Sequence, residues 1–218
     1  FELKDEESVC IEYEDEQGEL KRSDVTITSS IVKKSIADML IKNITGKLGA
    51  TEWGKHCAKN VGVSIVRANR ELVLRSSFLS STLRESKGRF CGIEISFSPV
   101  LDKIFGVTNN KQDAVRLIPY DMKTISLQAG FDNSEQEYLR DLEENSDSLL
   151  QVFKVVAVVE KHVAALTKAL IGINVQGKII KGASIIDPTA SESAADKATQ
   201  GSAYREGHGH KTTTLTNE

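Results

Sequence analysis

The sequence predicts an α+β fold, with a mixed sheet of about four strands, packed helices and a long C-terminal helix. Several short segments alternate apolar and polar residues, which is the period of a strand. Others repeat apolar residues at helical spacing, and residues 147–171 are apolar around most of a helix. The 218 residues are 39% hydrophobic and 27% charged, an ordinary globular composition that is ample for a sizeable core.

Residues 1–45 are predicted to form an acidic N-terminal strand and helix segment. Val9–Tyr13 and Asp24–Thr28 have the alternation expected of two strands around a turn. Apolar residues then recur at helical spacing from Ile31 to Ile44, so we expect a helix that ends near Gly46. Ser29 and Ser30 precede this helix and are its candidate caps.

Residues 46–125 are predicted to form the core of the fold. After an irregular, glycine-rich stretch at 46–60, the alternation resumes from Val61 to Leu74, with a hairpin turn near Ala68-Asn69. Residues 91–97 give a third strand of this region. A short helix is then expected over Pro99–Phe105, with Ser98 as its cap and Gly106 just past its end.

Residues 126–186 are predicted to be helical, and residues 187–218 to be a flexible tail or linker. Ser134 and Glu137 have the spacing of a capping box for a polar helix that runs to about Glu144. The longest helix is expected over Asp147–Ile171, where tertiary packing must support the many valines. After Pro188 the chain has too few large apolar residues to form a core.

Cysteine content and hydropathy favour a cytoplasmic protein. Cys10, Cys57 and Cys91 are odd in number and widely spaced, which is typical of reduced thiols. No apolar run is long enough to span a bilayer, so no membrane association is predicted. No metal site is predicted, because His56-Cys57 and Cys91 lack a fourth ligand at a usual spacing.

Two further patterns suggest phosphate binding. Residues 49–56 nearly spell a P-loop, but His56 stands where a magnesium-binding Ser or Thr is needed, so we favour a connection with Trp53 packed on the core. Residues 55–89 carry eight basic residues against Glu71 and Glu85. This basic stretch is a candidate nucleic-acid or protein contact, or else an ordinary solvated face.

The loop that follows Gly106 is the strongest functional signal. It reads Phe-Gly-Val-Thr-Asn-Asn-Lys-Gln-Asp over residues 105–113. Asn109 and Asn110 tolerate the left-handed backbone of a tight turn, and the loop is anchored by a short helix. We therefore expect Lys111 to be presented at the loop tip, where it suits contact with an anion in another domain.

Three segments in this order resemble the second domain of GHKL-type ATPases, most closely the MORC-like branch and its bacterial relatives. They are Gly-Val-Ser-Ile-Val-Arg-Ala-Asn-Arg-Glu-Leu at 62–72, Gly-Ile-Glu-Ile-Ser-Phe at 92–97 and Asn-Lys-Gln-Asp at 110–113. The resemblance covers about residues 60–116. It implies a ribosomal-protein-like transducer fold with a left-handed βαβ crossover, which gyrase, MutL and the related heat-shock chaperones place after the nucleotide-binding domain.

The resemblance also implies a role for the loop. Lys111 would contact the γ-phosphate of ATP, with Asn110 and Gln112 as polar neighbours, while Asn69, Arg70 and Glu94 would shape the hairpin turn and an internal ion pair. ATP and Mg²⁺ would be bound mainly by a preceding GHKL ATPase domain of the same parent protein, which would act as a homodimer.

The chain departs from the family in lacking the nucleotide pocket itself. Neither the Glu-x-x-x-Asn helix nor the Asp-x-Gly-x-Gly loop of these ATPases occurs. We therefore expect the chain, which begins at Phe1, to be a piece of a longer protein and to be inactive alone. The alternative function is an interaction module that binds DNA or a protein through the basic 55–89 face, with Lys111 incidental.

Overall fold

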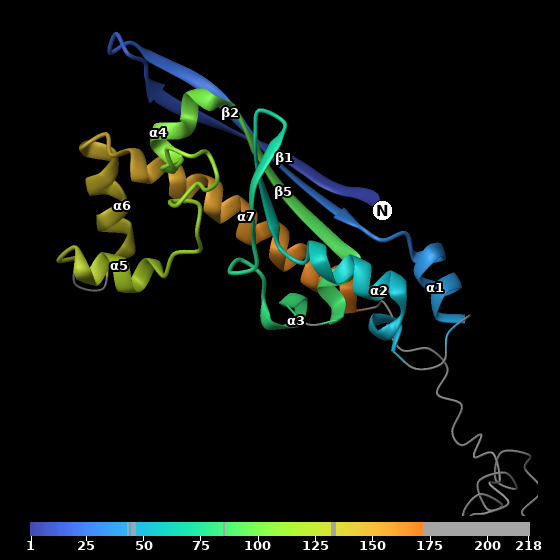
Figure 1. Ribbon diagram of the computed structural model, residues 1–218. Coiled ribbons are helices and arrows are strands. Elements are labelled where there is room, and N and C mark those ends of the chain that lie inside the picture. The colour runs from blue at the N-terminus through green and yellow to red at the C-terminus, as the bar shows by residue number, and fades with distance from the viewer. Residues whose placement is uncertain (43, 45–46, 85, 132–133, 172–218) are drawn as a thin grey trace, which may run out of the picture.

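A computed structural model describes residues 1–42, 44, 47–84, 86–131 and 134–171. These residues contain a five-stranded sheet with helices at both of its ends and along one face (Figure 1). The strands are β1 (Glu2–Glu14), β2 (Leu20–Ile31), β3 (Val63–Arg67), β4 (Arg70–Arg75) and β5 (Cys91–Phe97). The α-helices are α1 (Lys34–Lys42), α2 (Glu52–Cys57), α3 (Ser81–Arg84), α4 (Asp102–Phe105), α5 (Met122–Gln128), α6 (Glu135–Glu144) and α7 (Ser148–Ile171). Four 3-10 turns are η1 (Leu48–Ala50), η2 (Ala58–Asn60), η3 (Ser86–Phe90) and η4 (Pro99–Leu101).

The sheet is mixed, in the order β1-β2-β5-β3-β4. The β1/β2, β2/β5 and β3/β4 pairs are antiparallel, whereas β3 and β5 are parallel. The expected α+β class with a mixed sheet is confirmed, with one strand more than the predicted four. Because β2 pairs with β5, the N-terminal segment and the predicted core region belong to the same sheet.

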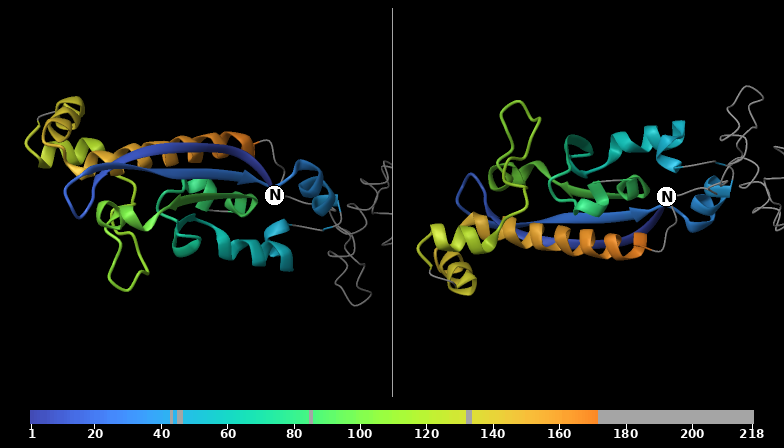
Figure 2. Two further views of the ribbon diagram at one scale, coloured as in Figure 1. Left: turned by 90° about the horizontal axis from the view of Figure 1, so that it is seen from above. Right: turned by 90° about the horizontal axis from the view of Figure 1, so that it is seen from below.

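The long helix α7 covers one face of this sheet and runs alongside β1 and β2 (Figure 2). Its buried valines, such as Val152, Val155 and Val159, share one core with Ile11 of β1 and Ile27 of β2. The predicted helix over 147–171 is confirmed. No helix in the described ranges is long and apolar enough to cross a membrane.

The N-terminal strands are longer than predicted, and this changes the start of the first helix. Ser29 and Ser30 lie inside β2, where they pair with β5, so the prediction that they cap a helix is wrong. The buried Ser29 hydroxyl instead donates to the Asp5 carbonyl at 3.4 Å. Helix α1 begins at Lys34, and Gly46, its expected end, lies outside the described residues.

Three of the predicted turns and helix caps are confirmed. Ala68 and Asn69 both have positive φ, of 47° and 64°, as a tight two-residue hairpin requires. Gly106 ends α4 in the left-handed conformation at φ 64°, and Ser134 accepts a hydrogen bond from the Glu137 amide at 3.1 Å. Ser98 precedes the turn at Pro99 as expected, but its hydroxyl makes no capping hydrogen bond.

The prediction that residues 46–60 are irregular is wrong for the described residues 47–60, most of which lie in short helices. Thr51 caps α2 by accepting a hydrogen bond from the Gly54 amide at 3.1 Å. Trp53 on this helix packs against Phe90, with ring centroids 5.7 Å apart. This contact confirms the favoured interpretation, in which Trp53 packs on the core and the segment is not a P-loop. The P-loop-like segment is therefore largely helical, and the amides of Gly54 and Lys55 donate to Thr51 instead of lining an open loop. The predicted tail at 187–218 lies outside the described residues.

Candidate functional site

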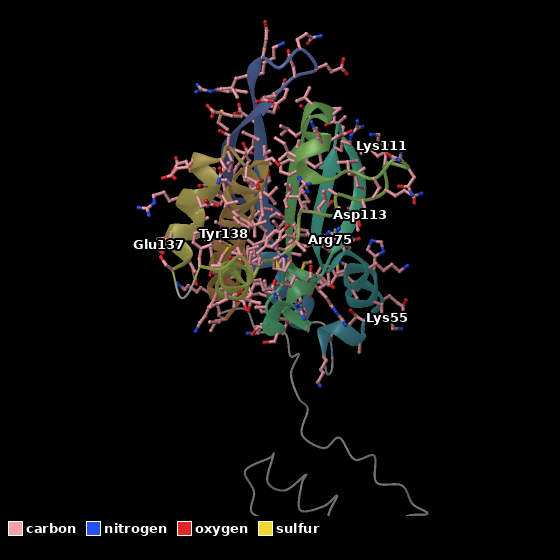
Figure 3. All side chains as sticks on the ribbon, turned by 90° about the vertical axis from the view of Figure 1, so that its left-hand side faces the viewer. Lys55, Arg75, Lys111, Asp113, Glu137 and Tyr138 are labelled. Atoms are coloured by element: carbon pink, nitrogen blue, oxygen red, sulfur yellow. The ribbon has the colours of Figure 1, made fainter. Side chains whose placement is uncertain are left out.

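Lys111 lies on a loop that is closed at its base by backbone pairing. Val107 and Ala114 form an antiparallel bridge, and the Thr108 amide donates to the Asp113 carbonyl at 2.9 Å. This loop follows α4 directly, and Gly106 allows the sharp reversal between the helix and the loop. Figure 3 shows Lys111 at the side of the molecule opposite Tyr138, with Arg75 and Asp113 closer to the base of the loop.

The residue with the left-handed backbone in this loop is Lys111 itself. Its φ is 55°, whereas Asn109 and Asn110, to which the sequence analysis assigned this conformation, do not have positive φ. A non-glycine residue rarely adopts such a φ, and it persists only where the surroundings impose it. Here the Lys111 amide donates to the Thr108 carbonyl at 2.8 Å, which closes the turn and fixes the point from which the side chain extends.

The side chains of Asn110 and Gln112 form hydrogen bonds within the loop and so support its shape. The Asn110 side-chain amide donates to the Gln112 side-chain oxygen at 2.9 Å, and the Thr108 hydroxyl donates to the Asn110 oxygen at 2.7 Å. Both side chains remain near the surface. They border an open hollow of about 580 Å³ that is lined by Thr108, Asn109, Asn110, Gln112 and Asp113.

The Lys111 amine is paired with a carboxylate of the same chain. Lys111 Nζ lies 2.9 Å from Asp102 Oδ2, at the start of α4. The same carboxylate accepts two hydrogen bonds from Arg67 of β3, from Nε to Oδ1 at 2.6 Å and from Nη2 to Oδ2 at 2.9 Å. The Lys111 side chain nevertheless stays 44% exposed, against 21% for both Arg67 and Asp102.

The two cations determine the charge state of Asp102. Burial raises the pKa of this carboxyl, but the hydrogen bonds from Arg67 and Lys111 outweigh burial and hold the pKa below its usual value. Asp102 is thus negatively charged at neutral pH. The cluster of Arg67, Asp102 and Lys111 carries a net charge of about +1, and its most exposed member is the lysine.

The base of the loop has an ion pair of its own. Arg75 of β4 pairs with Asp113 and donates to the Ala114 carbonyl at 3.3 Å. Asp113 also accepts a hydrogen bond from the Ala114 amide at 2.7 Å. β4 therefore anchors the loop where it returns to the body.

Most of the basic residues between 55 and 89 have bonding partners in the described part of the chain. Arg67 and Arg75 bond to Asp102 and Asp113, and Lys55 pairs with Glu52. Three more donate to backbone carbonyls. They are Arg84 to Leu79 and Ser77, Lys87 to Leu170, and Arg89 to Gly49. Six of the eight basic side chains are therefore bonded within the described fold, three of them to carboxylates.

Other residues singled out by the sequence have structural positions. Asn69 forms the hairpin turn, but Arg70 and Glu94 form no ion pair with a described residue. The partly buried ion pairs near this loop join Arg67 with Asp102 and Arg75 with Asp113. Cys57 and Cys91 are buried, and burial raises the pKa of the Cys91 thiol to about 11. Within the described ranges no group of three His, Cys, Asp or Glu side chains is arranged to hold a metal ion.

Sequence reasoning missed Asp102 and Arg67 as members of the site. Arg67 ends β3 and Asp102 begins α4, so nothing in their spacing shows that they converge on Lys111. The only sequence signal is an acidic residue one loop length before the lysine.

Comparisons of the chain with protein-family models, curated proteins and solved structures found no match.

Proposed function

We propose that this chain is the transducer part of a GHKL-type ATPase and that Lys111 senses the terminal phosphate of ATP bound by a preceding domain. The observation that carries the proposal is a half-exposed lysine on a hydrogen-bonded loop at the end of a capped helix. The ordered resemblance of segments 62–72, 92–97 and 110–113 to this family supplies the identity of the anion. Asn110 and Gln112 hold the loop in shape beside the lysine.

The energies favour exchange of Lys111 between its own fold and a phosphate. A partly exposed ion pair such as Lys111–Asp102 contributes less than about 1 kcal/mol. A charge-assisted hydrogen bond to a phosphoryl oxygen contributes about 1.5–3 kcal/mol where the docked domain excludes water from it. ATP offers that oxygen and ADP does not, so hydrolysis removes the contact and changes the preferred angle between the two domains. During hydrolysis the same amine would stabilise charge on the transferring phosphoryl group.

The sheet supports the finer fold assignment. A transducer of this family has a left-handed βαβ crossover, which is an exception to the usual hand. β3 and β5 are parallel neighbours in the described sheet, so we propose the crossover between them; their connection contains β4 as well as α3 and η3. We assign residues 46–125 to the transducer core, with residues 1–45 and 126–186 as its flanking parts.

The rest of the assignment follows from the same family. The parent protein would bind ATP and Mg²⁺ in its N-terminal GHKL domain, form a homodimer and act in the cytoplasm. This chain alone would not hydrolyse ATP, because it lacks the motifs of the nucleotide pocket. Tight binding of MgATP by residues 1–218 would therefore contradict the proposal.

The test is ATP hydrolysis by the full-length parent protein. Lys111→Ala should lower turnover at least tenfold, because the terminal phosphate loses a charged hydrogen-bond donor. Lys55→Ala is the matched control, since Lys55 is also an exposed lysine paired with an acid of its own chain. Equal turnover in wild type and Lys111→Ala would remove the sensor role.

The alternative, a DNA- or protein-binding module that uses the 55–89 face, has less support because most of those basic side chains are bonded internally. Mobility shifts of DNA at several salt concentrations test it, since phosphate contacts weaken steeply as salt rises.

A further inference from the structure

Asp102 accepts hydrogen bonds from two cations that come from different parts of the fold. Arg67 reaches it from the end of β3 and Lys111 from the loop after α4. The two cations bind it differently. Arg67 makes two contacts, one to each carboxylate oxygen, whereas Lys111 makes a single contact to Oδ2.

This asymmetry makes Lys111 the exchangeable partner. A bidentate arginine holds a carboxylate in a fixed orientation, while a lysine acts as a point charge on a flexible stem. If the amine leaves, Asp102 is still paired with Arg67, so no uncompensated charge remains in a partly buried position. The lysine is also twice as exposed as either of the other two groups.

The backbone allows this exchange without refolding of the loop. The Lys111 amide is bonded to the Thr108 carbonyl, and the loop base is closed by the Val107–Ala114 bridge. Only the lysine side chain has to rotate to move the amine from Asp102 to a phosphate that approaches from the solvent side.

We propose that Asp102, oriented by Arg67, is a positioning residue that holds the Lys111 amine and competes with the terminal phosphate of ATP for it. The inference rests on the proposed sensor function of Lys111. This competition lowers the apparent affinity for ATP. A lysine that spends most of its time on Asp102 is available to ATP for only a fraction of the time, and the apparent affinity for ATP falls by that fraction.

The test is a double-mutant cycle on ATP hydrolysis by the full-length protein, with kcat and KM for ATP measured for wild type, Asp102→Asn, Lys111→Ala and the double variant. Asp102→Asn should lower KM about two- to sixfold, because it removes a competing ion pair that is worth less than about 1 kcal/mol. In the Lys111→Ala background the same substitution should leave KM unchanged. A nonhydrolysable ATP analogue should show the same pattern in binding.

Two further variants serve as controls. Asp102→Glu retains the carboxylate and should keep KM near the wild-type value. Asp113→Asn changes a second carboxylate of the same loop that is paired with Arg75 instead of Lys111. Any effect of this change on KM should therefore be the same with and without Lys111. If Asp102→Asn does not fold, Asp102→Ser carries the same expectation.

The outcomes separate the two proposals. If Lys111→Ala lowers turnover but Asp102→Asn raises KM, or changes it equally in both backgrounds, Asp102 has only a structural role and the inference fails while the sensor function stands. If Lys111→Ala leaves turnover unchanged, both proposals fail together.

Discussion

The base and the tip of the Lys111 loop differ in how firmly they are held. At the base, Arg75 and Asp113 are 18% and 35% exposed, and the Val107–Ala114 bridge adds backbone pairing. At the tip, Lys111 is 44% exposed and is attached by one contact to Asp102. The loop is therefore held more firmly where it leaves the body than at its charged end, as the proposed delivery of a cation to a docking domain requires.

The largest expected effect on stability is at the base of the loop. Asp113→Ala leaves Arg75 partly buried without its carboxylate partner, which should lower the free energy of unfolding by about 2–3 kcal/mol. Lys111→Ala at the tip should cost less than about 1 kcal/mol, as an exposed ion pair does. Urea unfolding of residues 1–218 measures both. Equal losses would show that base and tip do not differ.

A smaller effect is expected where α4 turns into the loop. Gly106 has φ 64°, and a Cβ at this position would lie 2.9 Å from Val115 Cγ2. Gly106→Ala should therefore destabilise the fold by about 1–2 kcal/mol. Gly18→Ala is the matched control, because its φ is also positive, at 78°, but no atom lies within 4 Å. The difference between their unfolding midpoints isolates the steric part at the loop.

The smallest effect is a pH dependence at the tip. The pKa of Asp102 is lowered in the folded state, so its charge stabilises the fold above the unfolded pKa of about 4, and this stabilisation is lost as the pH falls through the lowered folded value. The free energy of unfolding of the wild type should exceed that of Asp102→Asn by about 1 kcal/mol at neutral pH, because the amide oxygen of asparagine still accepts a hydrogen bond from Arg67. Thermal unfolding at stepwise lower pH should show this gap closing below about pH 4. A constant gap would contradict the ionised cluster.

Local sequence patterns predicted most of the backbone elements around the site but not the side-chain contacts within it. The hairpin turn at Ala68-Asn69, the end of α4 at Gly106 and the position of Lys111 in a loop all follow from residues that are close in the chain. The pairing of Lys111 with Asp102 does not, because it needs the path of the loop back over α4. The left-handed φ of Lys111 also depends on the Thr108 hydrogen bond rather than on residue type.

By itself, the sequence determined the α+β class, the helices over 135–144 and 148–171 and the loop that carries the lysine, because periodicity and capping are encoded by neighbouring residues. Only the tertiary structure decided that Ser29 and Ser30 belong to a strand, since their partner β5 lies about sixty residues later. It also decided that Arg67 and Asp102 converge on Lys111. Pairing energy between distant segments is absent from any local pattern, and it is this energy that fixes both results.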